Sequence, residues 1–237
     1  MTSFLIGGTV AVDAGAITRA LTLAEQRAIR HVIITHAHID HTSSLPFLIE
    51  NLFGNGSEPV SIYCTRSVLG AVRRHLFNND TWPDFTRIPN DMLPALRITE
   101  VTPRQPFEIN GLRLTAIPVR HTVPTHGYLV EDAGGTVLFT SDTGPTREVW
   151  EVANRTANLV AVIVELSFPN RMQRVAELSL HLTPAMLAEE LAKLQRDVPV
   201  YLYHLKPPYI DELRAELAAT RFPHAVEELR QDDTYTF

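Results

Sequence analysis

The segment that most constrains the fold of this chain is an apolar run followed at once by a cluster of metal-binding side chains. Residues 31–35, His-Val-Ile-Ile-Thr, are mostly β-branched and apolar, which predicts a buried strand. Directly after them come His36, His38, Asp40 and His41. Because ligand sites in open α/β sheets lie at the carboxyl ends of strands, this loop is predicted to be functional. The alternative, a polar surface loop, gives so dense a set of nitrogen and oxygen donors no structural use.

Composition limits the classes of protein that the chain can represent. It has 237 residues, 45% of them apolar, which is enough for a large core. The net charge is −6 without any basic run, so binding to a nucleic-acid polymer is not expected. Cys64 is the only cysteine and falls in the predicted strand 60–64, so we expect a core residue and no intrachain disulfide. No signal peptide or membrane-spanning segment is recognisable, and a cytoplasmic protein without a membrane partner is expected.

Strand and helix patterns alternate along the rest of the chain. Apolar runs at 3–6 and 9–12 flank a Gly-Gly pair, which predicts a β-hairpin, and helical spacing predicts one helix over 16–29. Residues 167–180 show no periodicity and are predicted to be irregular. Further strands are predicted at 96–101, 107–109, 112–119, 125–130, 136–141, 159–166 and 198–203, and further helices at 45–52, 66–76, 147–154, from 184 and at 210–219. This order suggests a two-layered β core with helices outside.

Three further donors each follow a predicted strand: His121, Asp142 and His204. Side chains at equivalent strand ends can converge at one rim of a sheet although they are far apart in sequence. With the first loop they make seven donors, too many for one tetrahedral ion and suited to two ions that share Asp142. Imidazole and carboxylate without thiolate favour zinc, with manganese and iron as alternatives. For Asp142 the structural alternative is the cap of a helix that follows its strand.

A second pair of polar residues stands out in apolar surroundings. Glu165 lies near the end of the apolar run 159–166, where a carboxylate is costly to bury unless it is paired. His181 precedes the predicted helix that starts at Pro184. If the two side chains meet, the carboxylate would orient the imidazole, which could protonate a leaving group. The alternative is a solvated glutamate and a loop histidine, and the sequence pattern leaves both open.

The stretch 75–85 is rich in aromatic and amide side chains and has little periodicity. Such a segment is commonly a loop that packs over a site. A surface loop with one anchoring tryptophan, Trp82, is an equal alternative on composition alone.

The metal-binding pattern His36-x-His38-x-Asp40-His41, followed by His121, Asp142 and His204, resembles that of the metallo-β-lactamase superfamily. The resemblance covers nearly the whole chain. Further stretches narrow it, because they are similar to segments of the class II cyclic-nucleotide phosphodiesterases. These stretches are 75–79, 82–84, 142–145, 165–170, 180–184 and 204–208.

The resemblance implies an α/β (α+β) fold, an αββα four-layer sandwich, as a single hydrolase domain over residues 1–237. It also implies two divalent metal ions that share Asp142 as a bridge. The remaining ligands are divided three and three, His36, His38 and His121 for one ion and Asp40, His41 and His204 for the other. The chain departs from the family at Ser44, where a glycine is usual, and at its start, where relatives carry an earlier strand that looks missing or trimmed here.

The activity implied by the resemblance is hydrolysis of 3′,5′-cyclic nucleotides, cAMP or cGMP, to nucleoside 5′-monophosphates. Asp40, which is also a metal ligand, Glu165 as the orienting base and His181 as the general acid would be the catalytic residues. The substrate would be a small cyclic nucleotide, and the resemblance favours a homodimer. The segment 75–85 would cover the base and ribose, with five candidate contacts: His75, Phe77, Asn78, Asn79 and Trp82.

Three different functions compete with this activity. The first is that of another phosphodiester hydrolase of the same fold, either a nuclease that processes tRNA 3′ ends or a phosphodiesterase for another small cyclic phosphate. Nucleases of that kind carry a tRNA-gripping arm between the third metal histidine and the bridging aspartate. The 21 positions from His121 to Asp142 leave no space for such an arm. The second is that of a non-catalytic metal-binding protein, and the third is that of a thioester or lactam hydrolase, which would give Glu165 and His181 no role.

Overall fold

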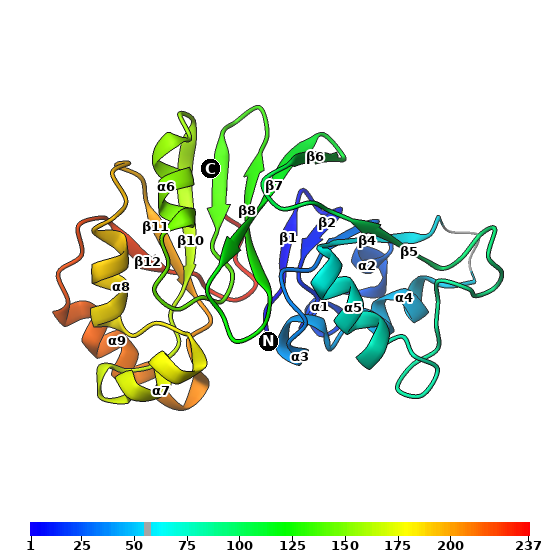
Figure 1. The fold of residues 1–237 in the computed structure, drawn as a ribbon, viewed down its shortest axis with the longest axis horizontal. Helices are drawn as coiled ribbons and strands as arrows, with labels where there is room; N and C mark the ends of the chain where they lie inside the picture. Colours follow the sequence, from blue (N-terminus) through cyan, green and yellow to red (C-terminus); the bar gives the residue numbers. More distant parts are fainter. Residues whose placement is uncertain (55–57) are drawn as a thin grey trace. The chain divides into compact units, whose positions relative to one another are not determined.

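The computed structural model describes residues 1–54 and 58–237. The chain divides into two compact units, Met1–Thr102 and Pro103–Phe237, and each unit has its own β-sheet and helices (Figure 1). This mixed α/β architecture with two sheets confirms the predicted fold class. Whether residues 1–237 act as a single domain stays a prediction.

The sheet of the first unit is built from the hairpin and the strand that precedes the histidine loop. Its order along the sheet follows the chain: β1 (Phe4–Ile6), β2 (Val10–Val12), β3 (His31–Ile33), β4 (Val60–Cys64) and β5 (Leu96–Glu100). β1 and β2 are antiparallel, as the predicted hairpin requires, and the other neighbours are parallel. The parallel strands place the carboxyl end of β3 beside that of β4.

The first helical segment of this unit differs from the prediction. Instead of one helix over 16–29, the chain forms α1 (Ile17–Ala20) and α2 (Leu23–Gln26). Thr22 separates them, because its hydroxyl accepts from the backbone N–H of Glu25 while its own N–H donates to the Glu25 carboxylate. This capping box restarts the helix at a new N-terminus, and apolar periodicity alone does not reveal it.

Three further helices complete the first unit: α3 (Ile39–Thr42), α4 (Leu45–Leu52) and α5 (Arg66–His75). Leu48 of α4 and Val68 of α5 pack in one buried cluster with Val32 and Ile62 of the sheet. Cys64 lies in the same cluster, and burial raises the pKa of its thiol to about 12. The thiol therefore stays protonated at neutral pH, which agrees with a core residue rather than a nucleophile.

The sheet of the second unit changes from antiparallel to parallel pairing midway. Its order is β12 (Val226–Glu228), β11 (Val200–Tyr203), β10 (Leu159–Glu165), β9 (Thr136–Phe139), β8 (Thr125–Glu131), β7 (Leu112–Val119) and β6 (Pro106–Ile109). Pairs from β6 to β9 are antiparallel, and pairs from β9 to β12 are parallel. Three neighbouring strands, β9, β10 and β11, therefore end at the same edge. The short strand β12, of only three residues, was not predicted from the sequence.

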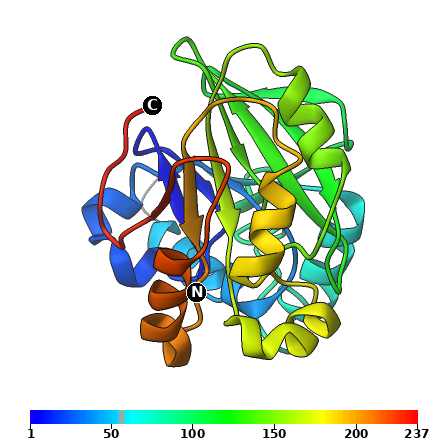
Figure 2. The ribbon, with the colours of Figure 1, turned by 90° about the vertical axis from the view of Figure 1, so that its left-hand side faces the viewer.

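Helices pack along the sheet of the second unit (Figure 2). They are α6 (Glu148–Arg155), α7 (Gln173–Ser179), α8 (Pro184–Leu191) and α9 (Ile210–Ala219). Trp150 of α6, Leu187 of α8 and Leu213 of α9 share one buried cluster with Val162 and Leu202 of the sheet. Thr183 caps the N-terminus of α8, since its side chain accepts from the N–H of Met186.

The prediction of an irregular segment at 167–180 is wrong, because these residues contain α7 and a preceding 3-10 turn, Asn170–Met172. Only Ala176 of α7 is buried, so the helix has no apolar stripe for a sequence pattern to reveal. Hydrogen bonds hold the segment instead: the N–H of Asn170 donates to Glu216, and the Asn170 side chain accepts from the N–H of Ala185.

No helix among the described residues is long and apolar enough to cross a lipid bilayer.

Candidate metal centre and acid–base pair

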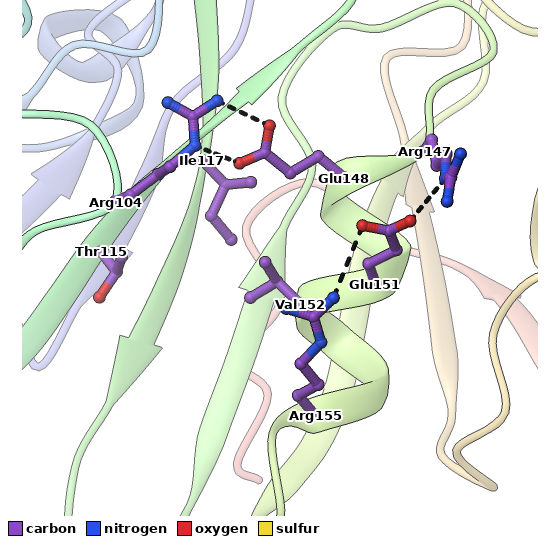
Figure 3. A pocket seen from close by; sticks show the side chains of 8 residues that line it. All are labelled: Arg104, Thr115, Ile117, Arg147, Glu148, Glu151, Val152 and Arg155. Carbon is purple, nitrogen blue, oxygen red and sulfur yellow. Dashed lines mark hydrogen bonds and ion pairs between the residues drawn. The ribbon is translucent and has the colours of Figure 1, made fainter.

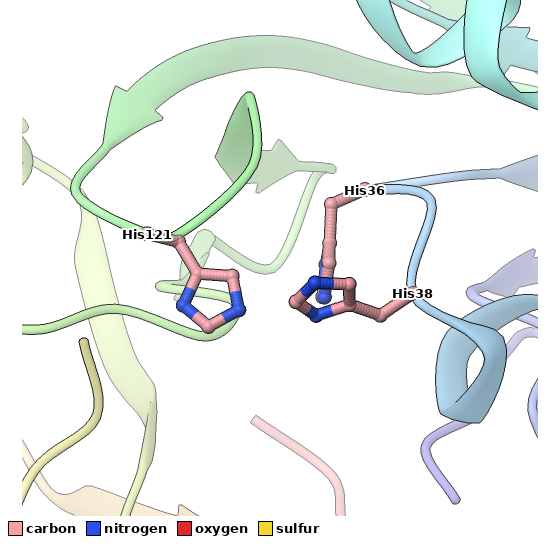
Figure 4. Close-up of side chains that lie close together, drawn as sticks. All are labelled: His36, His38 and His121. Carbon is pink, nitrogen blue, oxygen red and sulfur yellow. The ribbon is translucent and has the colours of Figure 1, made fainter. Parts of the chain in front are cut away.

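The loop after β3 gathers its imidazoles within the first unit. His36 and His41 have ring centroids 4.1 Å apart, and His36 and His38 have ring centroids 4.7 Å apart in an edge-on arrangement. His36 and His41 are buried, and Asp40 and His41 project from the short helix α3. Figure 4 draws His36 and His38 of this loop, together with His121 of the second unit. The sequence-predicted histidines of the first unit are thus clustered.

Asp13, at the end of β2, is a site residue that was not predicted from the sequence. It is 2% exposed, and its carboxylate accepts from the Thr35 hydroxyl at 2.8 Å and the Thr35 N–H at 2.9 Å. The same carboxylate lies 2.6 Å from Nδ1 of His41. The Thr35 hydroxyl in turn lies 3.0 Å from Nδ1 of His36. The available signal was an aspartate that directly follows an apolar strand, at position 13.

Ser44, at the position where the family usually has a glycine, is accommodated through a contact with Gly15. A Cβ atom at position 15 would lie 1.8 Å from the carbonyl oxygen of Asp40, so this position requires glycine. The Gly15 carbonyl accepts from the hydroxyls of Ser43 at 2.6 Å and Ser44 at 3.2 Å. Ser44 therefore adds a hydrogen bond that fastens the helix after the histidine loop to this turn.

The predicted donors of the second unit also meet at one edge. Asp142 follows β9 and His204 follows β11, and His204 Nε2 lies 3.3 Å from an Asp142 carboxylate oxygen. His121 follows β7, and its Nδ1 lies 3.0 Å from the carbonyl oxygen of Leu180. His121, Asp142 and His181 offer ligand atoms within 4.8 Å of one another. The sequence-predicted convergence of His121, Asp142 and His204 is thus present within this unit.

Several of these donors lie next to strained backbone. Ser141, directly before Asp142, has φ of 57°, His204 itself has φ of 70°, and Asp13 has φ of 59°. Residues other than glycine seldom adopt positive φ, and such strain persists only where the surrounding structure holds it. Strain at Asp13, which supports His41, and at or beside the donors His204 and Asp142 is typical of residues placed for function rather than for packing.

Glu165 and His181 do meet, as the functional interpretation of the sequence required. Glu165 is fully buried at the end of β10, and its Oε1 lies 3.1 Å from His181 Nδ1. Oε1 also accepts from the N–H of Leu182 at 3.1 Å, and Oε2 accepts from the Ser167 hydroxyl at 2.8 Å. The carboxylate thus joins the end of β10 to the loop before α8, and Ser167 is a further member of the group that was not predicted from the sequence.

The electrostatics of this pair favour a retained proton. Burial alone lowers the pKa of His181, but the hydrogen bond and negative charge of Glu165 outweigh it, so the pKa of His181 is raised. Full burial likewise raises the pKa of Glu165, against the hydrogen bonds from His181 and Ser167. The pair therefore holds a proton over a wider pH range than either group would in water, as a general acid requires.

The predicted substrate segment is a loop with its own internal bonding. Asn78 accepts from the N–H groups of Asp80 and Thr81 through its side-chain oxygen, and Asn79 accepts from the N–H of Asp84. Both amides thus already shape the loop, whereas His75 is exposed at the end of α5.

The aromatic residues of this segment are placed differently from one another. Phe77 is 3% exposed and packs in the core of the first unit, so its ring offers no open face. Trp82 is half-buried and contacts Phe47 edge-to-face, with ring centroids 5.2 Å apart. Phe47, on the first turn of α4, is 47% exposed and was not among the sequence-predicted contacts.

A cavity of about 580 Å³ opens in the second unit beside α6 (Figure 3). Its walls carry ion pairs, with Arg104 on Glu148 and both Arg147 and Arg155 on Glu151. The lining residues are Arg104, Thr115, Ile117, Arg147, Glu148, Glu151, Val152 and Arg155. None of the predicted site residues lines this cavity, so it is separate from the donor clusters.

The chemistry of the donor set fits divalent cations. Nδ1 of His36, His41 and His121 lies within hydrogen-bonding distance of an oxygen, which assigns the proton to Nδ1 and leaves Nε2 to ligate. Lys206 Nζ lies 2.7 Å from His204 Nε2, consistent with a lone pair on that nitrogen as well. Imidazoles oriented from behind by oxygen acceptors are the usual arrangement in zinc proteins.

The fold and these donors agree with a family match. The model of the β-lactamase superfamily domain matches residues 9–205. The protein therefore belongs to the metallo-β-lactamase superfamily, a class of metal-dependent hydrolases whose fold implies divalent metal ions.

Two curated proteins and one solved structure are similar to this chain. A probable 3′,5′-cyclic-nucleotide phosphodiesterase from Yersinia pestis is 28% identical over 211 residues, which cover 78% of this chain and 59% of that protein. A ribonuclease BN from Erwinia tasmaniensis is 30% identical over 105 residues, 44% of this chain and 32% of that protein. The chain thus spans less than two thirds of the length of these curated relatives. The crystal structure of unliganded yeast PDE1 matches with a TM-score of 0.75 at 19% identity, over 88% of this chain and 69% of that chain, which shows a shared fold.

Removing Asp13 is expected to weaken metal binding. In Asp13→Ala the imidazole of His41 loses its oxygen acceptor, and loss of such a partner typically lowers metal affinity about 10- to 100-fold. The measurement is zinc titration of the metal-free variant against a chromophoric chelator, with circular dichroism to confirm folding. The matched control is Asp233→Asn, an exposed aspartate near the C-terminus, which should bind zinc as the wild-type protein does. Unchanged zinc affinity in folded Asp13→Ala would contradict the role assigned to Asp13.

Proposed function

We propose that this protein is a phosphodiesterase that hydrolyses 3′,5′-cyclic nucleotides to nucleoside 5′-monophosphates at a centre of two divalent metal ions. The proposed ligands are His36, His38 and His121 for one ion, Asp40, His41 and His204 for the other, and Asp142 for both. Zinc is the proposed metal, because the set is rich in imidazole and lacks thiolate.

The observation that carries the proposal is the buried Glu165–His181 pair. Cleavage of a cyclic phosphodiester releases an alkoxide, which is a poor leaving group unless it receives a proton. His181 Nδ1 faces Glu165 Oε1, so the proton that His181 can deliver is the one on Nε2. His121 and Asp142 offer ligand atoms within 4.8 Å of a ring nitrogen of His181, which supports a role for His181 beside a phosphate that a metal ion on these ligands would hold.

The metal ions, when bound, would stabilise negative charge on the phosphoryl oxygens and lower the pKa of a bound water. The residues of the protein itself orient the general acid and protonate the leaving group. Glu165 accepts from His181 and from the N–H of Leu182, which fixes the imidazole on its loop. Ser167 donates to the second carboxylate oxygen and holds Glu165 in place. His181 then donates its Nε2 proton to the departing ribose oxygen.

The base and ribose are proposed to lie against the segment 75–85. His75 and Asn79 are exposed there, and Trp82 is half-buried against Phe47. An aromatic face is a sequence-tolerant surface for a nucleobase. Phe77 and Asn78, which are engaged in the core and in the loop itself, would act by shaping the segment.

A second candidate is another phosphodiester hydrolysis, favoured by the 30% identity to a ribonuclease BN over 105 residues. The same acid and ligands would serve it, since only the group carried by the phosphate differs. The net charge of −6 weighs against a long RNA substrate, because such binding depends on positive charge.

A substrate panel tests the proposal. Zinc- or manganese-loaded protein would be assayed with cAMP, cGMP, a 2′,3′-cyclic nucleotide and a tRNA precursor, with products separated by chromatography. The expected result is turnover of a 3′,5′-cyclic nucleotide to the 5′-monophosphate. The Asp142→Asn variant, purified in the same way, controls for contaminating phosphodiesterases. Turnover of the 2′,3′-cyclic nucleotide or tRNA precursor alone would overturn the proposal in favour of the second candidate.

A further inference from the structure

The residue that joins His121 to the loop of His181 is Leu180, at the end of α7. Leu180 has φ of 54° and ψ of 56°, which is the left-handed conformation. Its N–H and that of His181 both bond to the carbonyl of Ala176. This is the turn that usually ends a helix on a glycine, because glycine alone adopts positive φ without cost.

The left-handed turn determines where the Leu180 carbonyl points. That oxygen lies 3.0 Å from His121 Nδ1, and the next residue is His181, whose own Nδ1 faces Glu165. The backbone conformation of Leu180 therefore positions both the carbonyl that faces His121 and the next residue, His181. A change of φ at residue 180 would turn both away together.

The loop that packs against Leu180 has a glycine, Gly144, at the point of closest approach. A Cβ atom at Gly144 would lie 3.2 Å from Leu180 Cα, 3.3 Å from Leu180 Cδ2 and 3.4 Å from the Leu180 carbonyl carbon. Gly144 itself is tied down, because its N–H donates to the carbonyl of Arg120, the residue before His121. The loops at 120–121, 142–144 and 180–181 are thus packed backbone against backbone, with little room for Leu180 to move.

We propose that Leu180 is a positioning residue, whose left-handed backbone aims its carbonyl at His121 Nδ1 and so sets the metal affinity of the His121 imidazole. The inference rests on the proposed metal centre, in which His121 is a ligand, but not on the identity of the substrate. The conformation of Leu180 is the functional property here, and its side chain is secondary.

A series of substitutions at position 180 separates conformation from packing. Glycine adopts the left-handed conformation freely and asparagine does so readily, whereas a β-branched valine is strongly disfavoured there. Leu180→Gly and Leu180→Asn are therefore expected to bind zinc within a few-fold of wild type. Leu180→Val, although apolar and closest in shape, should bind about 10- to 100-fold more weakly, as metal sites do when a ligand loses its orienting partner.

The measurement is competition of the metal-free proteins with a chromophoric chelator for zinc, with circular dichroism to confirm folding. A side-chain packing role gives the reverse order, with valine nearest to wild type and glycine and asparagine weakest, and this result would overturn the proposal. His121→Ala is the reference. If the wild-type protein and His121→Ala bind zinc equally, the proposal of a metal centre that includes His121 is wrong. If His121→Ala binds zinc weakly but the variants at position 180 show the order expected from side-chain packing, only the proposed role of Leu180 is wrong.

A second measurement needs no variant and so does not depend on Leu180→Val folding. Nitrogen-15 NMR of the metal-free wild-type protein should show His121 with its proton on Nδ1, protected from exchange, because Leu180 supplies the acceptor. A His121 proton on Nε2 would contradict the proposal.

Discussion

His181→Ala is expected to hydrolyse a 3′,5′-cyclic nucleotide about 100- to 10,000-fold more slowly than the wild-type protein, because removal of a general acid typically costs that much. In the proposed reaction the ribose oxygen leaves as an alkoxide and needs a proton. His181 is 8% exposed and held 3.1 Å from Glu165, so water is poorly placed to replace it as the acid. The measurement is kcat for the cyclic nucleotide with the metal-loaded variant.

A substrate with a good leaving group is the control for this prediction. Bis-p-nitrophenyl phosphate releases p-nitrophenolate, which needs no proton, so His181→Ala should turn it over at close to the wild-type rate. His224→Ala, a half-buried histidine of the same unit that contacts the carbonyls of Leu191 and Leu194, should leave the ratio of the two rates unchanged. If His181→Ala slows both substrates equally, His181 is a ligand or a structural residue and not the acid.

The carboxylate behind His181 gives the same prediction a pH signature. An acid must be protonated to act, so kcat falls as pH rises through the pKa of His181. The hydrogen bond and charge of Glu165 raise that pKa, and Glu165→Gln removes the charge. The basic limb of the pH profile is therefore expected to move to lower pH in Glu165→Gln. An unmoved limb would show that the limb reports another group.

Asp142→Ala is expected to abolish hydrolysis, with a loss of about a thousandfold or more, since metal ions supply several kcal/mol of charge stabilisation and each 1.36 kcal/mol is tenfold in rate. Asp142 is 1% exposed and lies 3.3 Å from His204 Nε2. It is proposed to bridge both ions, so its loss should release at least one of them. The measurements are kcat and the metal content of the purified variant.

Asp142→Asn keeps the shape of the side chain and loses its charge, so it separates ligation from packing. It should fold as the wild-type protein does and still lose metal and activity, whereas Asp233→Asn should retain both. Asp142→Asn with full metal content and wild-type kcat would rule out the bridging role.

The fold could be predicted where the sequence carries a period or a strong turn. β-branched runs identified β3, β4 and β10, and a glycine pair identified the first hairpin. The errors fall where structure is held by polar contacts. The break at Thr22 depends on a capping box with Glu25, and α7 is held by hydrogen bonds of Asn170 rather than by an apolar stripe.

The candidate site divides in the same way. The metal-donor residues could be predicted from the sequence, because His36, His38 and Asp40 follow an apolar strand in one short segment. The supporting residues Asp13 and Ser167 were not, because a single aspartate or serine after a strand has many ordinary uses. Phe77 is an aromatic residue whose burial no composition argument decides.

The sequence by itself determined where most strands lie and which side chains follow them. Both follow from local patterns of two to ten residues. Only the tertiary structure decided which of them meet. It brought Glu165 to His181, Asp13 to His41 and the Leu180 carbonyl to His121, contacts between residues 16, 28 and 59 positions apart. Such contacts depend on strand order and on backbone conformations with positive φ, which are set by packing of the whole unit and leave no periodic trace in the chain.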